Sequence, residues 1–74
     1  MTQKEKVLKH LYEFGSVTPL EALKEYGIMR LASRMADLKA DGVPFHVVME
    51  KSKNRNGEPV HYARYILGRA KDVH

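Results

Sequence analysis

The spacing of hydrophobic residues changes once along this 74-residue chain, at Gly42. Before that glycine, apolar residues recur three and four positions apart, which is the period of one face of an α-helix. After it, apolar and polar residues alternate, which is the period of a half-buried β-strand. The sequence therefore predicts an α+β fold in which helices come first and a β-hairpin follows.

Two helix starts carry the same local signal. Thr2 and Thr18 are each followed three residues later by a glutamate, Glu5 and Glu21, and this is the spacing of a capping box. Pro19, directly after the second threonine, is suited to the first position of a helix. Both threonines therefore predict the start of a helix, the second one most strongly.

Glycines are expected to end both helices. Gly15 and Gly27 can adopt the left-handed conformation that commonly follows a helix. Only Ser16 and Val17 lie between the first helix and the next cap, so we expect a stub of strand there. The apolar residues of the two helices are Val7, Leu8, Leu11 and Phe14 on the first, and Leu20, Ala22, Leu23 and Tyr26 on the second.

A third helix is predicted to begin at Ile28 and to end at Asp41 and Gly42. Its apolar stripe falls at positions i, i+3, i+7 and i+10, counted from Ile28. At 100° per residue, the opposite face has two arginines near its start and small residues further along. That face carries Met29, Arg30, Ser33, Ala36, Asp37 and Ala40, with Arg34 at its border.

The hairpin register follows from the pattern of its faces. A two-residue loop would place Met49 opposite Arg64 and would mix apolar and polar side chains. A three-residue loop, Arg55–Gly57 with the glycine left-handed, makes one face wholly apolar, and we predict this register. Its pairs are Phe45 with Leu67, Val47 with Tyr65, and Met49 with Ala63. The predicted core is Val7, Leu8, Leu11, Leu23, Ile28, Leu31, Met35, Leu38, Phe45 and Tyr65.

The length allows one small domain, which buries about 60% of the surface that its unfolded chain exposes. The chain has no cysteine, so neither a disulfide nor a thiolate metal site is expected. We predict one domain over residues 1–68 and a disordered tail over residues 69–74. No apolar run approaches the roughly 20 residues that span a bilayer, and the N-terminus has no signal core. We therefore expect a cytoplasmic protein with no membrane partner.

The sequence offers little support for catalysis or metal binding. It has no nucleophile at a meaningful spacing from a base, no phosphate-cradling glycine loop and no grouped carboxylates. Its four histidines are scattered, and metal ligands would have to converge. We expect no enzyme activity, no cofactor and no metal site, and we interpret the histidines as solvated surface residues: His10, His46, His61 and His74.

The basic residues are concentrated in one segment. The net charge is +4, and the segment Lys51–Gly57 contains three bases and no acid. A hairpin tip presents flexible cations and amides away from the core, and contacts to phosphate need such groups. The candidate phosphate-binding residues are Lys51, Lys53, Asn54, Arg55 and Asn56.

Four stretches of the sequence together match the order of elements of a known protein family. They are Thr18–Leu23, Gly27–Met35, Asp37–Lys39 with Gly42, and Tyr62–Tyr65. Together they place a short capped helix, a tight turn, a further helix and a hairpin in order. This order resembles a small winged helix-turn-helix family that is common in phages and prophages, over residues from about 2 to 67. The resemblance implies DNA binding, with the third helix in the major groove and the hairpin as a wing on the backbone or in the minor groove. Ser33 and Ala36 stand where the stricter, repressor-like motif has buried aliphatic residues, so the likeness is to the winged variety.

The outer face of the third helix supplies candidates for base contact. Arginine can bond bidentately to guanine, and serine can bond to base edges or phosphate, which selects Arg30, Ser33 and Arg34. The alternative is a solvated face with Arg34 paired to an acid of the second helix. Thr18 is a candidate phosphate contact because helix N-termini bind anions, although capping alone explains this residue.

We predict a sequence-reading binder of double-stranded DNA, acting as a phage or prophage transcriptional regulator or as an excisionase-like architectural factor. A second copy, or another protein on DNA, is a further partner that this size allows. The alternative is a winged-helix module for protein interaction, such as a phage protein that docks on a host RNA polymerase. In that case Met29, Ala36 and Ala40 would form part of the binding face. The three bases at the wing tip favour DNA.

Overall fold

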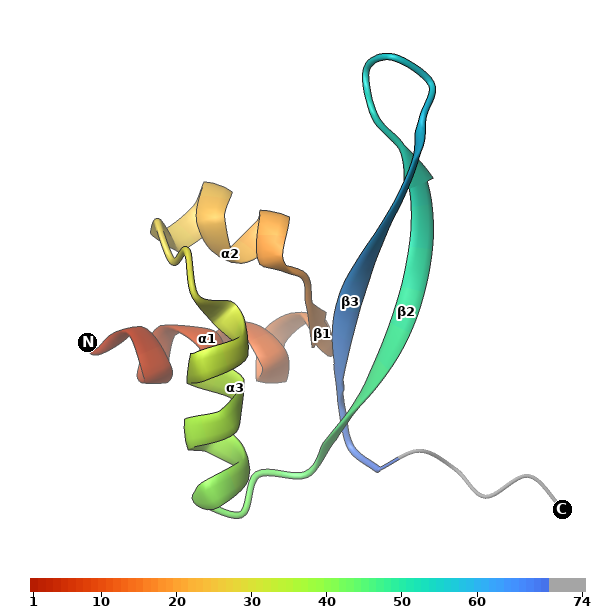
Figure 1. The fold of residues 1–74 in the computed structure, drawn as a ribbon. Coiled ribbons are helices and arrows are strands. Elements are labelled where there is room, and N and C mark those ends of the chain that lie inside the picture. The colour runs from red at the N-terminus through yellow and green to blue at the C-terminus, as the bar shows by residue number, and fades with distance from the viewer. Residues whose placement is uncertain (70–74) are drawn as a thin grey trace, which may run out of the picture.

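The computed structural model describes residues 1–69 and shows three helices with a three-stranded antiparallel sheet (Figure 1). Two of the strands form a long hairpin that projects from the helices. The predicted α+β winged helix-turn-helix architecture is confirmed, while residues 70–74 of the predicted tail lie outside the described residues. The elements are α1 (Gln3–Phe14), β1 (Ser16–Val17), α2 (Pro19–Tyr26), α3 (Leu31–Ala40), β2 (Phe45–Lys53) and β3 (Pro59–Leu67).

Both predicted capping boxes are present. The hydroxyl oxygen of Thr2 accepts a hydrogen bond from the Glu5 N–H at 3.2 Å, and Glu5 Oε1 accepts one from the Thr2 N–H at 2.9 Å. Thr18 and Glu21 form the same two bonds, at 3.2 and 2.9 Å. The glycine after each of these helices has a left-handed backbone, as predicted. Local sequence chemistry therefore accounts for both ends of α1 and α2.

The start of α3 differs from the prediction. The helix begins at Leu31 and not at Ile28, because the left-handed Gly27 and the residues after it form the turn between α2 and α3. The Ile28 N–H donates to the Ala22 carbonyl at 3.1 Å, which ties this residue to the end of α2. Ile28 is nevertheless fully buried, as the apolar stripe predicts.

The core confirms most of the predicted residues, but α2 contributes differently. Leu23 is 46% exposed and Leu20 is 63% exposed, because the short helix turns Ala22 inward instead. Phe14, expected on the apolar stripe of α1, is also exposed, whereas Val17 is fully buried and was not predicted. The buried apolar residues are Val7, Leu11, Val17, Ala22, Ile28, Leu31, Met35 and Leu38, with Leu8, Phe45 and Tyr65 among those packed against them.

The hairpin has the predicted register. Phe45 pairs with Leu67, and the ladder runs without a break to Lys53 opposite Pro59. Gly57 is left-handed, with φ 80°, as a three-residue loop requires. The stub β1 pairs with the far side of β3, which gives the strand order β1-β3-β2. The base of the wing is therefore held to the body through β3.

No helix within residues 1–69 is long and apolar enough to cross a membrane. The longest, α1, has 12 residues, whereas a span needs about 20.

Candidate nucleic-acid interface

The N-terminus of α3 is basic and uncapped. Arg30 occupies the cap position, makes no side-chain hydrogen bond to the helix, and is exposed. The first turn of α3 has no acidic residue either. A helix N-terminus already carries partial positive charge, so an arginine there is unfavourable for the helix alone and favourable for an anionic partner.

A shallow hollow of 330 Å³ borders this helix start. The cap residue Arg30 and Ser33 of α3 line it, together with Pro19 of α2 and Tyr65 of the central strand β3. Met29, in the turn between the two helices, also lines the hollow and is 84% exposed. The structure therefore brings Arg30 and Ser33, two of the three predicted base-reading residues, to one open surface beside the sheet.

The wing presents its lysines on the same face of the hairpin as Tyr65. Side chains alternate along a strand, and the pairs Val47 with Tyr65 and Lys51 with His61 place Val47, Lys51 and Lys53 on that face. The base of this face borders the first turn of α3 through Tyr65. An uncapped basic helix start and a basic hairpin therefore share one side of the molecule.

A comparison with protein-family models matches residues 2–70 to a family described as a winged helix-turn-helix domain. The chain belongs to this family. In helix-turn-helix domains that bind DNA, the second helix of the motif lies in the major groove. The second helix of the motif in this chain is α3. Comparisons with curated proteins and with solved structures gave no match.

The tip of the wing is stabilised by Asn54, a predicted phosphate contact. Its Oδ1 accepts hydrogen bonds from the N–H groups of Asn56 and Glu58, both at 3.0 Å. Its Nδ2 donates to the Glu58 carboxylate at 3.3 Å. Arg55 and the side chain of Asn56 are exposed at the same tip. Asn54 therefore has a structural role in the loop, and its neighbours are the ones available to a ligand.

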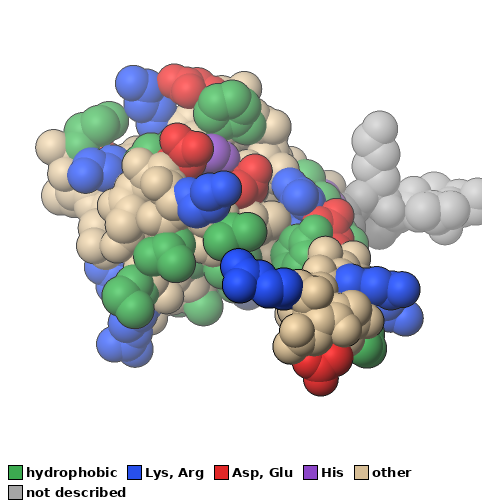
Figure 2. Space-filling model, turned by 90° about the horizontal axis from the view of Figure 1, so that it is seen from above, with side chains coloured by type: hydrophobic (Ala, Val, Ile, Leu, Met, Phe, Trp, Pro, Cys, Tyr) green, Lys and Arg blue, Asp and Glu red, His purple; other side chains and the backbone are tan. Residues whose placement is uncertain are grey.

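The basic side chains of the wing have no acidic partner among the described residues, in contrast to Lys4, Lys9, Arg34 and Arg64, which are paired. Within residues 1–69, no ion pair involves Lys51, Lys53 or Arg55. Figure 2, which looks onto α2 and the wing tip, shows Lys and Arg side chains on both sides of the tip. Since these cations are not neutralised within the described chain, the winged domain keeps them available for an anionic partner.

Arg34 does not join Ser33, but it lines a separate hollow together with Arg30 and Met29. Its Nη2 lies 3.4 Å from the Asp37 carboxylate on the same helix, and its side chain is partly buried. This pairing within α3 replaces the pairing with an acid of α2 that the alternative interpretation considered. Arg34 also does not line the hollow beside Tyr65.

Thr18 acts as a cap in this winged domain. Thr18 is 5% exposed, and its hydroxyl oxygen accepts a hydrogen bond from the Glu21 N–H. That hydroxyl also donates to the Glu21 carboxylate at 3.2 Å. The hydroxyl therefore already acts as both donor and acceptor of hydrogen bonds within the protein.

Sequence reasoning missed a polar network on the other face of the hairpin. Arg64 Nε donates to the Glu50 carboxylate at 2.7 Å, and its Nη1 donates to the Ser16 hydroxyl at 3.0 Å. The hydrogen bond from Arg64 lowers the pKa of Glu50, and that same bond raises the pKa of Arg64. The available signal was the register itself, because Glu50 and Arg64 lie diagonally on one face of the ladder.

The interpretation of the histidines as solvated is wrong at two positions. His10 is 5% exposed, and its Nδ1 lies 2.7 Å from the Tyr26 hydroxyl. His46 is partly buried, with its Nδ1 2.8 Å from the Gly68 carbonyl oxygen. Both depend on contacts across the fold, which periodicity along the chain does not reveal. His61 is exposed, and His74 lies outside the described residues.

Proposed function

We propose that this protein reads double-stranded DNA, with α3 in the major groove and the wing on the phosphate backbone. The observation that carries this proposal is the shared face of Lys51, Lys53 and Tyr65, because Tyr65 borders the hollow that Arg30 lines. One duplex could then contact both the helix start and the wing. The family membership supports the same conclusion.

The two parts of this interface are suited to different contacts. Flexible lysines provide charge without sequence information, so Lys51, Lys53 and Arg55 are proposed to bind phosphates. Arg30 stands at the cap of α3 and Ser33 on its first turn, beside the small residue Ala32, which allows a close approach to base edges. The one acidic residue of α3, Asp37, lies in its C-terminal half, so the N-terminal half is the part proposed to enter the groove.

Binding to duplex DNA at several salt concentrations tests the proposal. Replacing Lys51, Lys53 and Arg55 by alanine should weaken binding to every duplex alike. Each lost phosphate contact should also reduce the log–log salt slope by about 0.9. Unchanged affinity and slope in this variant would contradict the role of the wing.

A control variant should remove the same charge elsewhere. Lys6, Lys9 and Lys24 lie on α1 and α2, so their replacement by alanine lowers the net charge equally. We expect this variant to keep most of the salt slope. An equal loss in both variants would indicate a general charge effect rather than a site on the wing.

For the biological role, we propose a transcriptional regulator or an excisionase-like architectural factor of the phage and prophage type. A single small domain offers one recognition helix and one wing, so cooperation with a second copy or another protein on DNA would raise its specificity. Selection from a random duplex library, read at two salt concentrations, tests for a preferred sequence. A bound site with two half-sites would support pairing on DNA.

The exposed apolar residues favour a second candidate, a module for protein interaction. Leu20, Leu23 and Met29 are exposed on α2 and the following turn, and Val47 and Met49 are exposed on the wing. An interaction module would use such residues and would not need the wing bases. Absence of duplex binding at about 50 mM salt would favour this candidate.

A further inference from the structure

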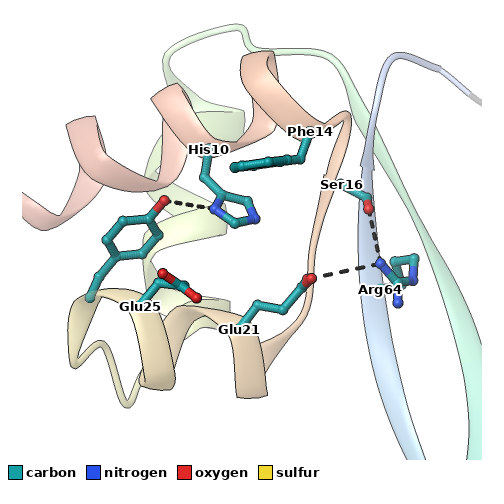
Figure 3. A pocket seen from close by; sticks show the side chains of 7 residues that line it. His10, Phe14, Ser16, Glu21, Glu25 and Arg64 are labelled. Atoms are coloured by element: carbon teal, nitrogen blue, oxygen red, sulfur yellow. Dashed lines mark hydrogen bonds and ion pairs between the residues drawn. The ribbon is translucent and has the colours of Figure 1, made fainter.

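A second hollow, of 440 Å³, lies between α1, α2 and β3 and shares no residue with the proposed DNA interface (Figure 3). Its volume falls within the range of small-molecule sites, roughly 300–1,000 Å³. It is lined by His10, Phe14, Ser16, Glu21, Glu25, Tyr26 and Arg64. Although the net charge of the protein is +4, this lining contains two carboxylates, Glu21 and Glu25, and one guanidinium, Arg64.

His10 provides an unsatisfied polar atom in this hollow. The residue is 5% exposed and its Nδ1 is paired with the Tyr26 hydroxyl at 2.7 Å. Its Nε2 is buried and has no hydrogen-bond partner. Figure 3 shows that this second ring nitrogen points away from the tyrosine, into the space between α1, α2 and β3. A buried imidazole nitrogen without a partner is costly, so a ligand that bonds to it would be stabilised.

The carboxylates determine the charge that such a ligand should carry. Glu21 and Glu25 lie one turn apart on α2 and both line the hollow. Glu25 has no hydrogen bond or ion pair within residues 1–69. Burial, together with the charges of Glu13, Glu25 and Glu21, raises the pKa of Tyr26, which indicates a negative potential at this place.

The one cation of the lining, Arg64, is already paired. Its Nε lies 2.7 Å from Glu50, outside the hollow, and its Nη1 donates to the Ser16 hydroxyl. Arg64 is 3.9 Å from Glu21, so it only partly offsets that carboxylate. The Glu25 carboxylate and His10 Nε2 are therefore left without partners, and the rings of Phe14 and Tyr26 line the same hollow.

We propose that this hollow binds an organic cation, a guanidinium or a primary ammonium group, between Glu25 and the Nε2 of His10. The Glu25 carboxylate pairs with the cation, and the Phe14 and Tyr26 rings provide the faces that attract it. In the tautomer that fits this ligand, His10 Nδ1–H donates to the Tyr26 hydroxyl oxygen. The Nε2 lone pair then accepts a hydrogen bond from the cation.

Heteronuclear NMR titration of the DNA-free protein tests the site. The probes are agmatine, a glycine peptide with a single arginine, and inorganic phosphate. We expect agmatine to shift the signals of the lining residues and to move the His10 ring towards the Nδ1–H tautomer. Binding of the peptide as well would identify an arginine side chain of another protein as the source of the cation, whereas binding of agmatine alone would identify a free small molecule.

Glu25→Gln is the decisive variant, because it removes a surface charge and keeps the shape of the side chain. It should weaken agmatine binding at least about tenfold, as the loss of a charge-assisted contact predicts. Glu58→Gln, at the wing tip, makes the same charge change far from the hollow and should bind normally. Equal weakening by both variants, shifts centred elsewhere, or binding of phosphate in place of agmatine would overturn the proposal. Because DNA is absent, the result is independent of the proposed DNA binding.

Discussion

The starts of α2 and α3 differ in almost every respect, although only a few residues separate the two helices. At α2, Thr18 and Glu21 satisfy each other in a capping box, and the glutamate gives the first turn a negative charge. At α3, Arg30 provides no cap and the first turn has no acid. The face of the hairpin beside Thr18 carries Arg64, which is paired. The face beside Arg30, which Pro19 of α2 also borders, carries the unpaired wing lysines.

This difference shows that the two helices are stabilised in different ways. A cap stabilises α2 locally, so its short length and exposed leucines are tolerated. α3 has no such cap and depends instead on Leu31, Met35 and Leu38, which are buried in the core. Because packing holds α3 in place, its N-terminus is left open to a partner.

Truncating the buried residue at the start of α3 should cost the most. Leu31 is 2% exposed, and Leu31→Ala should lower the free energy of unfolding by about 2–5 kcal/mol through lost packing and a cavity. Thermal or denaturant unfolding measures this change. Ala32→Ser, on the exposed neighbour, is the control and should cost far less. An unchanged midpoint for Leu31→Ala would show that packing does not anchor α3.

Removing the arginine at the start of α3 should affect binding and not folding. Arg30→Ala should weaken binding to a preferred duplex by about 1–3 kcal/mol and weaken binding to random DNA much less. Stability should stay the same or rise slightly, because a cation leaves the positive end of the helix. Titrations with both duplexes and an unfolding curve measure these effects. Lys24→Ala changes the charge equally on α2 and should leave sequence preference intact.

Removing the cap of α2 should affect folding stability and not DNA binding. Thr18→Ala should lower the free energy of unfolding by about 0.5–2 kcal/mol, since the Glu21 N–H loses its acceptor. Thr18→Ser keeps the hydroxyl and should retain most of the stability. We expect DNA affinity, measured well below the unfolding temperature, to be little changed. Normal stability with reduced affinity would instead assign Thr18 to a phosphate contact.

The smallest expected effect is the loss of stability on acidification at the Glu50–Arg64 pair of the hairpin. The hydrogen bond from Arg64 holds the pKa of Glu50 below its ordinary value of 4.5. The stabilisation is therefore present above that value and is lost as the pH falls through the lower, folded-state pKa. Unfolding curves at decreasing pH measure this effect. The free energy of unfolding of Glu50→Gln should fall less on acidification than that of the unchanged protein. Glu58→Gln, at the exposed tip, should keep the same acid dependence as the unchanged protein.

Local rules were sufficient wherever neighbouring residues determine the structure. Threonine and glutamate three residues apart were enough to predict the starts of α1 and α2. The hairpin register was also predictable, because a shift by one residue would have mixed Met49 with Arg64 on the same face. The concentration of bases between Lys51 and Arg55 is visible in the sequence alone and was enough to suggest an anionic partner.

The tertiary structure decided which side of each element is covered. Leu20 and Leu23 have the spacing of a buried face, but α2 packs through Ala22. The sequence alone does not determine this rotation of α2 about its axis. His10 resembles any surface histidine until α2 brings the Tyr26 hydroxyl to its ring. The place of Arg30 likewise depended on where the turn after Gly27 ends and α3 begins. The physical reason is the same in each case: burial and pairing depend on contacts between residues far apart in the chain, and periodicity describes only neighbours along it.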